Sequence, residues 1–360
     1  QEERVELEPR SLASGQSGQR VQVAVREPPA QLLLGEPIPH AFTTMDAPKH
    51  RKWRAVVRKD YTPEGVRAHE SRFRALARDV LGPLLERGEF DFYQDYANRV
   101  FCLNSGYNLG LPREDAIMWR ALIDEIIHRE RGQRGSSERN QRAAAELGGY
   151  LFDYVAKLRR DPGLASGHTA AYLNADIDGE RLDDRGMVDL LMNFLILGSE
   201  TTPMVCAGSL YYLEKHPGQR AAVLADHGLV QRLFLETARY DQPTNMLCRR
   251  AVRDFTLNGA AIKAGHNLLY IYASANRDGE EFERPDEFDI FRSHARDLSY
   301  GAGGHKCLGM HLATMGGVIV LQEFLESVAS HEVRLDRCER AYGEHLSGYL
   351  RVPVRVSRRA

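Results

Sequence analysis

A glycine-dense turn that carries a single cysteine constrains this chain more than any other stretch of its sequence. The turn runs from Leu298 to Gly309 as LSYGAGGHKCLG, with the cysteine at position 307, and a helical pattern follows directly. Glycines let a backbone approach a large flat ligand closely. Backbone N–H groups of the turn and the positive end of the following helix both favour the thiolate form of a cysteine. The turn is therefore typical of a thiolate that binds a metal whose opposite face stays open.

Simpler interpretations of the same turn stay open from these residues alone. A lone cysteine is most often a small buried apolar residue, and a glycine run is most often an ordinary loop. Two nucleotide-binding motifs are excluded. The third glycine of a dinucleotide fingerprint falls on Lys306, and no Gly-Lys-Ser/Thr follows as a phosphate loop requires.

Composition narrows the class of protein. The 360 residues carry a net charge of −2, with 43% hydrophobic and 27% charged residues, as in an ordinary globular protein with a sizeable core. This balance gives no general attraction to nucleic acid or to anionic lipid. The five cysteines are widely spaced, so neither a disulfide framework nor a zinc site is expected. The polar N-terminus and the short longest apolar run, 190–198, predict a cytoplasmic protein with no membrane anchor.

Hydrophobic periodicity predicts a mainly α chain with a small β subdomain. Residues 1–45 are expected to be an irregular N-terminal segment with a strand near 21–25, and 46–360 to form a single domain. Helices are predicted at 48–58, 64–87, 90–105, 113–130, 138–160, 184–215, 218–225, 228–240 and 308–328. Strands are predicted at 249–257, 261–262, 268–271, 333–335 and 352–356, with a hairpin marked by Gly259 and Gly265.

Two clusters of polar residues fall on predicted helices. Glu236 and Arg239 lie three residues apart and can form an ion pair, although such pairs are common on solvated helices. Glu200 and Thr201 lie inside an apolar helix, where an unpaired polar group costs about 1–3 kcal/mol. Pro203 removes a backbone hydrogen bond, so a kink or widened turn is predicted there. A kinked core helix with satisfied hydroxyls would explain the same residues.

Taken in order from about Asp46 to the C-terminus, these segments resemble a cytochrome P450 of the soluble bacterial type. Gly301, Gly303 and Gly309 have the glycine spacing of that family's haem-ligand loop. Tyr300 stands where the family usually has phenylalanine, and His305 where it usually has a basic residue. The stretch before His50 is shorter than usual, so the resemblance implies a P450 fold whose N-terminal part is shortened or incomplete.

The resemblance assigns expected roles to the polar residues. Cys307 would be the axial ligand of haem b, iron protoporphyrin IX, in a loop formed with Tyr300, Gly301, His305 and Gly309. His50, Arg54 and Arg249 would bind the haem propionates. Glu200 would relay protons and Thr201 would hold water or the bound oxygen species. Glu236, Arg239 and Arg292 would form a buried structural network that positions the cysteine loop.

The chain departs from the family pattern at several positions. The usual Ala-Arg-x-Glu after the cysteine is Ala313-Thr-Met-Gly316, and a usual histidine of the cysteine loop is Asp297. Leu197 stands where alanine or glycine is common, and Pro203 follows the acid–alcohol pair. In the family, Leu197 and Pro203 would lie where oxygen and substrate are accommodated, and Asp297 where a propionate is bound.

The resemblance implies a haem-thiolate monooxygenase that inserts one oxygen atom into a medium-sized organic substrate, such as a secondary-metabolite intermediate. A ferredoxin or flavodoxin-type donor with its reductase would supply electrons at a basic face. That face would comprise Lys49, Arg51, Lys52, Arg58 and Lys306, although an ordinary solvated surface would explain these residues equally well. The substrate pocket would be lined by Leu34, Ile38, Phe42, Asn193, Phe194, Leu197, Thr244, Asn245, Met246 and the turn 346–348.

Two alternatives to this function remain on sequence grounds: another chemistry of the same fold, and a non-catalytic relative. The same fold serves peroxygenases, phenol-coupling catalysts and isomerases, although the Glu200–Thr201 pair argues against the peroxide-driven chemistry. A non-catalytic haem or ligand-binding relative would also fit the departures at Asp297 and Gly316.

Overall fold

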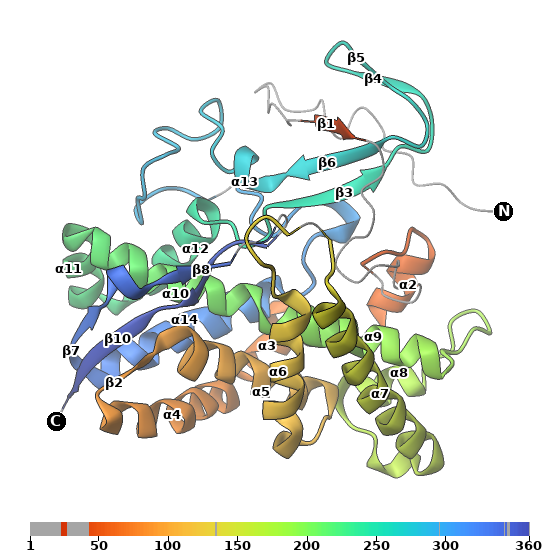
Figure 1. Ribbon diagram of the computed structural model, residues 1–360, viewed down its shortest axis with the longest axis horizontal. Helices are drawn as coiled ribbons and strands as arrows, with labels where there is room; N and C mark the ends of the chain where they lie inside the picture. The colour runs from red at the N-terminus through yellow and green to blue at the C-terminus, as the bar shows by residue number, and fades with distance from the viewer. Residues whose placement is uncertain are drawn as a thin grey trace.

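The computed structural model describes residues 23–26, 43–133, 135–294, 296–341, 343 and 346–359. Within them the chain is mainly helical, with small sheets in two places, β1 and β3–β6 at the top of the view and β2, β7 and β10 at its lower left (Figure 1). The α-helices are α2 Lys49–Ala55, α3 Pro63–Arg67, α4 Glu70–Arg87, α5 Asn98–Leu109, α6 Ala116–Ile127, α7 Glu138–Arg160, α8 Gly167–Leu173, α9 Asp184–Ser199, α10 Thr201–Lys215, α11 Pro217–Ala225, α12 Val230–Tyr240, α13 Tyr272–Ala275 and α14 Met310–Ser327.

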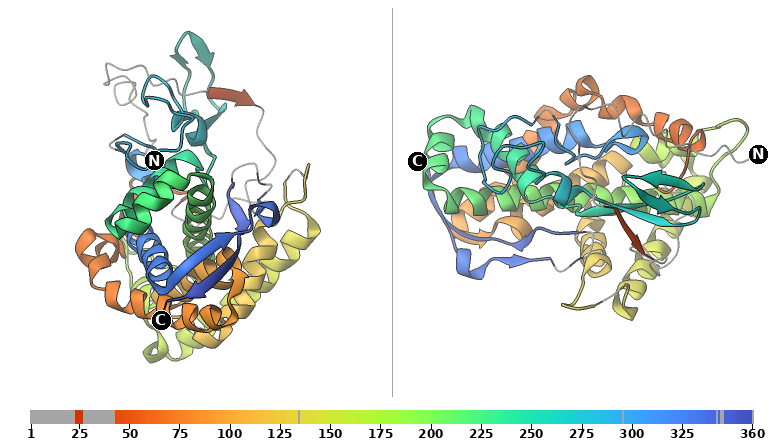
Figure 2. Two further views of the ribbon diagram at one scale, coloured as in Figure 1. Left: turned by 90° about the vertical axis from the view of Figure 1, so that its left-hand side faces the viewer. Right: turned by 90° about the horizontal axis from the view of Figure 1, so that it is seen from above.

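The strands form four small antiparallel sheets among the described residues. Their orders are β1–β6–β3, β2–β10–β7, β4–β5 and β8–β9. The strands are β1 Val23–Arg26, β2 Glu89–Asp91, β3 Met246–Arg250, β4 Phe255–Leu257, β5 Ala260–Ile262, β6 Asn267–Ile271, β7 Val328–Val333, β8 Glu339–Arg340, β9 Tyr349–Arg351 and β10 Pro353–Arg358. The β4–β5 hairpin projects from the helical body beside β3 and β6, whereas β7 and β10 lie along the α10 and α14 side (Figures 1 and 2).

Two large apolar clusters hold the helices together. One joins α4, α10, α12 and α14 to the β10 sheet, and the other joins α2, α5, α6, α7 and α9. The stretch Asp184–Lys215 is long and apolar enough to cross a membrane, but 78% of its most hydrophobic window is buried in the protein. The apolar character of this stretch therefore reflects burial, since α9 packs in the second cluster and α10 in the first.

The predicted fold class is confirmed, and most predicted helices are present with shifted ends. The predicted hairpin is confirmed, since β4 and β5 pair with Phe255 opposite Ile262. The predicted single strand at 249–257 is wrong, because the ladder that begins at Met246 ends at Arg250 and β4 belongs to another sheet. The predicted helix at 90–105 begins with strand β2 and a π-helical turn, Phe92–Ala97. Helix α8 and strands β2, β8 and β9 were not predicted.

Candidate active site

The cysteine turn, residues 298–309, is a tight loop that leads directly into α14. The amide of Cys307 donates to the carbonyl of Tyr300 at 2.8 Å, and the amide of Lys306 donates to Gly303 at 3.1 Å. Gly301 and Gly303 have φ values of +65° and +71°, which side chains other than glycine rarely adopt. The loop therefore needs its glycines and presents an exposed Cys307 side chain.

The thiol of Cys307 experiences opposing influences. Neighbouring protein atoms displace part of the solvent around the thiol, which raises its pKa. The backbone N–H of Gly309 and the positive charge of Arg54 act in the opposite direction. A thiolate at this position is thus stabilised by one backbone donor and one cation, and a bound metal ion would add to both.

A cluster of basic side chains lies beside the cysteine loop. His50 stacks on His305 with ring centroids 4.0 Å apart, and the Arg54 guanidinium donates to the carbonyl of Lys306. Burial, together with the nearby His50, Arg249 and Arg54, lowers the pKa of His305 to about 4. No carboxylate among the described residues forms an ion pair with Arg54 or Arg249. The cluster thus brings together four of the residues expected to bind haem.

The buried Nε2 atom of His50 has no hydrogen-bond partner among the described residues. An unpaired polar atom in this position costs free energy unless a ligand satisfies it. Two carboxylates next to His50, Arg54 and Arg249 would neutralise the cluster and accept from its donors. Together with the accessible thiol of Cys307, these residues fit a haem whose iron binds the sulfur and whose propionates meet the cations.

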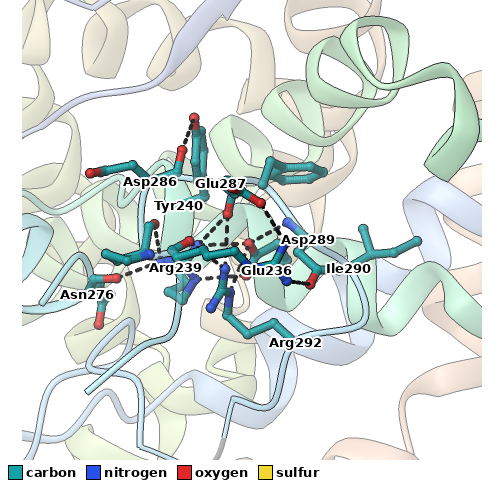
Figure 3. A network of polar contacts seen from close by, with 12 residues as sticks. Glu236, Arg239, Tyr240, Asn276, Asp286, Glu287, Asp289, Ile290 and Arg292 are labelled. Carbon is teal, nitrogen blue, oxygen red and sulfur yellow. Dashed lines mark hydrogen bonds and ion pairs between the residues drawn. The ribbon is translucent and has the colours of Figure 1, made fainter. Parts of the chain in front are cut away.

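The Glu236–Arg239 pair lies in a buried network at the end of α12 (Figure 3). Both side chains are 0% exposed, and Arg239 donates twice to Glu236 at 2.8 Å. Arg239 also donates to the carbonyls of Asn276 and Pro285 at 2.7 and 3.0 Å. The Nε atom of Arg292 lies 3.6 Å from Glu236, so the predicted third arginine joins the pair.

The network continues into the cysteine loop through Asn276. The side chain of Asn276 accepts from the amide of Leu298 at 2.7 Å and donates to Gln242 at 3.0 Å. Gln242 in turn donates to the carbonyl of Ser299 at 3.1 Å. The ion pair is therefore connected through Asn276 and Gln242 to the two residues that begin the loop of Cys307.

Glu200 lies at the break between α9 and α10, where the predicted kink is found. Its backbone has φ −110° and ψ −54°, and Pro203 lacks the amide that would continue the helix. The Ser199 hydroxyl donates to the carbonyl of Leu195 at 2.5 Å. Thr201, the first residue of α10, is half-buried beside Glu200. The acid and the alcohol thus meet at an irregular turn in the core.

Three residues that the sequence analysis missed surround the Glu200 carboxylate. Arg120 on α6 forms an ion pair with Glu200 and also with Asp124. The hydroxyl of Tyr93, from the π-helical turn, donates to Glu200 at 3.0 Å. Burial raises the pKa of Glu200 to about 7; Arg120 opposes the shift and Asp124 adds to it. Glu200 is therefore poised to change protonation near neutral pH.

The expected substrate-pocket residues are only partly brought together. Asn193 is buried and donates to the hydroxyl of Thr43 at 3.1 Å, and Leu197 is 45% exposed one turn further along α9. Phe194 faces another direction and packs in the aromatic group of Tyr61, His168 and Tyr172, so its place in the pocket is not supported.

The loop after α12 meets the C-terminal turn, as expected of two walls of one pocket. Thr244 pairs with Leu346, and Ser347 donates to the carbonyl of Pro243 at 2.8 Å. Asn245 accepts from the amide of Ala273, and Met246 begins β3. Phe42, Leu34 and Ile38 lie outside the described residues.

Two of the five expected docking cations are paired within the chain. Lys49 and Lys52 form ion pairs with Glu180 and Asp178 of the α8–α9 connection. Arg51 and Arg58 are exposed and form no ion pair within the described part of the chain. A hollow of about 600 Å³ lies beside the cysteine loop, with Lys306 in its wall. The basic face is therefore narrower than the sequence indicated.

Comparison with known proteins places the chain among bacterial haem enzymes. Residues 163–334 match the family model described as Cytochrome P450. A Mycobacterium tuberculosis protein named as cytochrome P450 123 is 36% identical to this chain over 320 residues. The match covers 89% of this chain and 79% of that protein. Cyclomarin C epoxidase of Salinispora arenicola is 30% identical, covering 81% and 74%. The solved structure of HmtN, a hydroxylase involved in himastatin biosynthesis, superposes with a TM-score of 0.79 at 27% identity, covering 88% and 82%.

Proposed function

This chain belongs to the cytochrome P450 family, and as such is a monooxygenase; we propose that it binds haem b through Cys307 and inserts one atom of O₂ into a medium-sized organic substrate. The observation that carries the proposal is the accessible thiol of Cys307 next to Arg54 and Arg249, which form no ion pair among the described residues, and to the stacked imidazoles of His50 and His305. We further propose that residues 46–360 act as one haem domain in the cytoplasm.

Haem with a thiolate ligand supplies dioxygen activation, with two electrons and two protons consumed and the second oxygen atom released as water. The residues of the chain would divide the remaining tasks. Cys307 would hold the iron from one side, while His50, Arg54 and Arg249 would bind the propionates. Glu200 would give a proton toward the Thr201 hydroxyl and recover it from the Arg120–Asp124 side, where Asp124 is 37% exposed. Tyr93 would hold the carboxyl in place by its hydrogen bond.

We propose a secondary-metabolite intermediate as the substrate class. Two similar proteins are named for the cyclomarin and himastatin systems. The expected pocket wall includes both apolar and amide side chains, namely Leu197, Met246, Asn193 and Asn245, which suits a molecule with some polar groups. Substrate binding would be detected as a spin-state shift of the haem in a screen of such compounds.

The direct test of the haem-ligand proposal uses the carbon monoxide complex of the reduced protein, for the wild type and for Cys307→Ser. The wild type is expected to give the absorption band characteristic of thiolate ligation, and the variant to lose it because a serine oxygen is a poor substitute for sulfur. Cys102→Ser, which changes a buried cysteine on α5, is the matched control and should keep the band. A thiolate band in Cys307→Ser would exclude Cys307 as the ligand.

We propose that an acidic ferredoxin or flavodoxin-type protein, kept reduced by its own reductase, docks near Arg51, Arg58 and Lys306. Changing Arg51 and Arg58 together to glutamate is expected to slow haem reduction about tenfold at low salt, because complementary charge steers association. The effect should shrink as salt screens the charges. Arg142→Glu, an exposed change on α7, serves as the control. Equal reduction rates for the double variant and the control would contradict the docking face.

A further inference from the structure

Two of the residues at which the cysteine segment departs from the P450 pattern form one hydrogen bond. Tyr300 stands seven residues before Cys307 and Thr314 seven residues after it. The Tyr300 hydroxyl lies 2.8 Å from the Thr314 hydroxyl. Neither departure has a role in the function proposed above, yet in the structure each is the partner of the other.

The direction of this hydrogen bond follows from its neighbour. Thr314 has one hydroxyl proton, and its oxygen lies 3.0 Å from the carbonyl of Met310, which can only accept. Thr314 therefore donates to Met310, and Tyr300 donates to Thr314. Burial raises the pKa of Tyr300, which keeps its hydroxyl in the neutral, donating form.

Tyr300 thus holds the segment around Cys307 at two points. Its carbonyl accepts from the amide of Cys307 at 2.8 Å. Its side chain reaches past the cysteine to Thr314, which lies one turn into α14. The two ends of the backbone segment 300–314, which includes Cys307, are therefore joined by this hydrogen bond.

On the helix side, the segment that carries Thr314 is closely packed against other helices. A Cβ atom on Gly316 would lie 2.7 Å from the ring of Phe73, and one on Gly317 would lie 2.1 Å from the ring of Phe234. Helix α14 is thus in close contact with α4 and α12 just after Thr314, with no space for a side chain at position 316 or 317. At the loop end Gly301 and Gly303 have positive φ, and the Tyr300–Thr314 hydrogen bond is a side-chain contact between this end and α14.

From these contacts we propose that Tyr300 and Thr314 form a side-chain latch that fixes the cysteine loop to α14 and keeps the sulfur of Cys307 in its ligand position. Tyr300 and Thr314 are then positioning residues, acting through Cys307. The inference rests on the proposed ligand role of Cys307, and the experiment below separates the two.

The experiment is a double-mutant cycle on the haem-loaded protein, with Thr314→Val, Tyr300→Phe and both together. The readout is the rate at which the thiolate-type carbon monoxide spectrum converts to the thiol type. Thr314→Val is expected to raise this rate about fivefold in the wild-type background, because it removes the acceptor of a half-buried hydroxyl. In the Tyr300→Phe background the same change should alter the rate less than about twofold, because the partner hydroxyl is already gone.

Two further measurements complete the test. Thr314→Ser keeps the hydroxyl and should stay within about twofold of the wild type, and the thermal midpoint of the whole protein should change little in all variants. Equal effects of Thr314→Val in the two backgrounds, or equal effects of valine and serine, would overturn the latch. Loss of the thiolate spectrum in Cys307→Ser alongside either result would show that the ligand assignment survives. Its retention in that variant would remove the basis of the latch as well.

Discussion

Arg239→Met is expected to lower the free energy of unfolding by about 3–5 kcal/mol, because it leaves the carboxylate of Glu236 buried without its guanidinium. Both side chains are 0% exposed, so solvent cannot replace the lost partner. The remaining arginine of the network, Arg292, lies 3.6 Å from Glu236 and points its terminal nitrogens at backbone carbonyls instead. Denaturant unfolding followed by far-ultraviolet circular dichroism measures the change.

Two companion variants make this result specific. Glu236→Leu combined with Arg239→Met removes both charges and is expected to be more stable than Arg239→Met alone, because no unpaired charge stays buried. Arg351→Met breaks an ion pair with Glu339 whose side chains are 53% and 64% exposed, and it should cost less than about 1 kcal/mol. If Arg239→Met cost no more than Arg351→Met, the network would not support the fold.

A structural role for the pair also predicts a defect at the cysteine loop. Arg239 holds the carbonyl of Asn276, and the Asn276 side chain holds the amide of Leu298. Asn276→Ala is therefore expected to loosen the loop while leaving the ion pair intact, and to lower the fraction of protein that retains the thiolate-type spectrum. Comparison of that fraction between Asn276→Ala and Arg239→Met separates the loop effect from the loss of overall stability.

The sequence predicted the parts of the site that depend on local spacing. The glycines around Cys307, the pair Glu236 and Arg239, and the break caused by Pro203 are all short-range patterns whose geometry follows from the backbone. The stacking of His50 on His305 was not predicted as a contact, because it joins residues 255 positions apart. It nevertheless brings together two residues that the family resemblance had marked separately.

What the sequence could not provide was the set of long-range polar partners. Arg120 and Asp124 lie four residues apart on a helix, a pattern that predicts a local pair and says nothing of Glu200, 80 residues away. Tyr93 lies 107 residues from Glu200, and no local pattern connects the two. The strand at 249–257 was overextended for a related reason, since β-propensity does not reveal which sheet a strand joins.

Glu200→Gln is expected to reduce turnover about 100-fold, because a buried amide cannot transfer the proton that the proposed mechanism requires. In the wild type, turnover should also fall as the pH rises through about 7, since burial raises the pKa of Glu200 to about 7 and the carboxylate form cannot donate. The variant should lack this limb of the profile. Turnover is measured with a substrate identified by spin-state screening, over a pH range in which haem content is constant.

Glu323→Gln is the matched control for that pH profile. Glu323 is also buried and bound by two arginines, Arg74 and Arg78, but it lies on α14 away from Glu200. Its change is expected to leave the limb near pH 7 in place, and loss of the limb in both variants would contradict the assignment to Glu200.

The pH dependence of stability tests the raised pKa of Glu200 independently of turnover. Because the folded protein binds the Glu200 proton more tightly than the unfolded chain, the wild type should lose stability as the pH rises from about 4.5 to about 7. Glu200→Gln removes this loss, so the free energy of unfolding of the variant relative to the wild type should increase over that range.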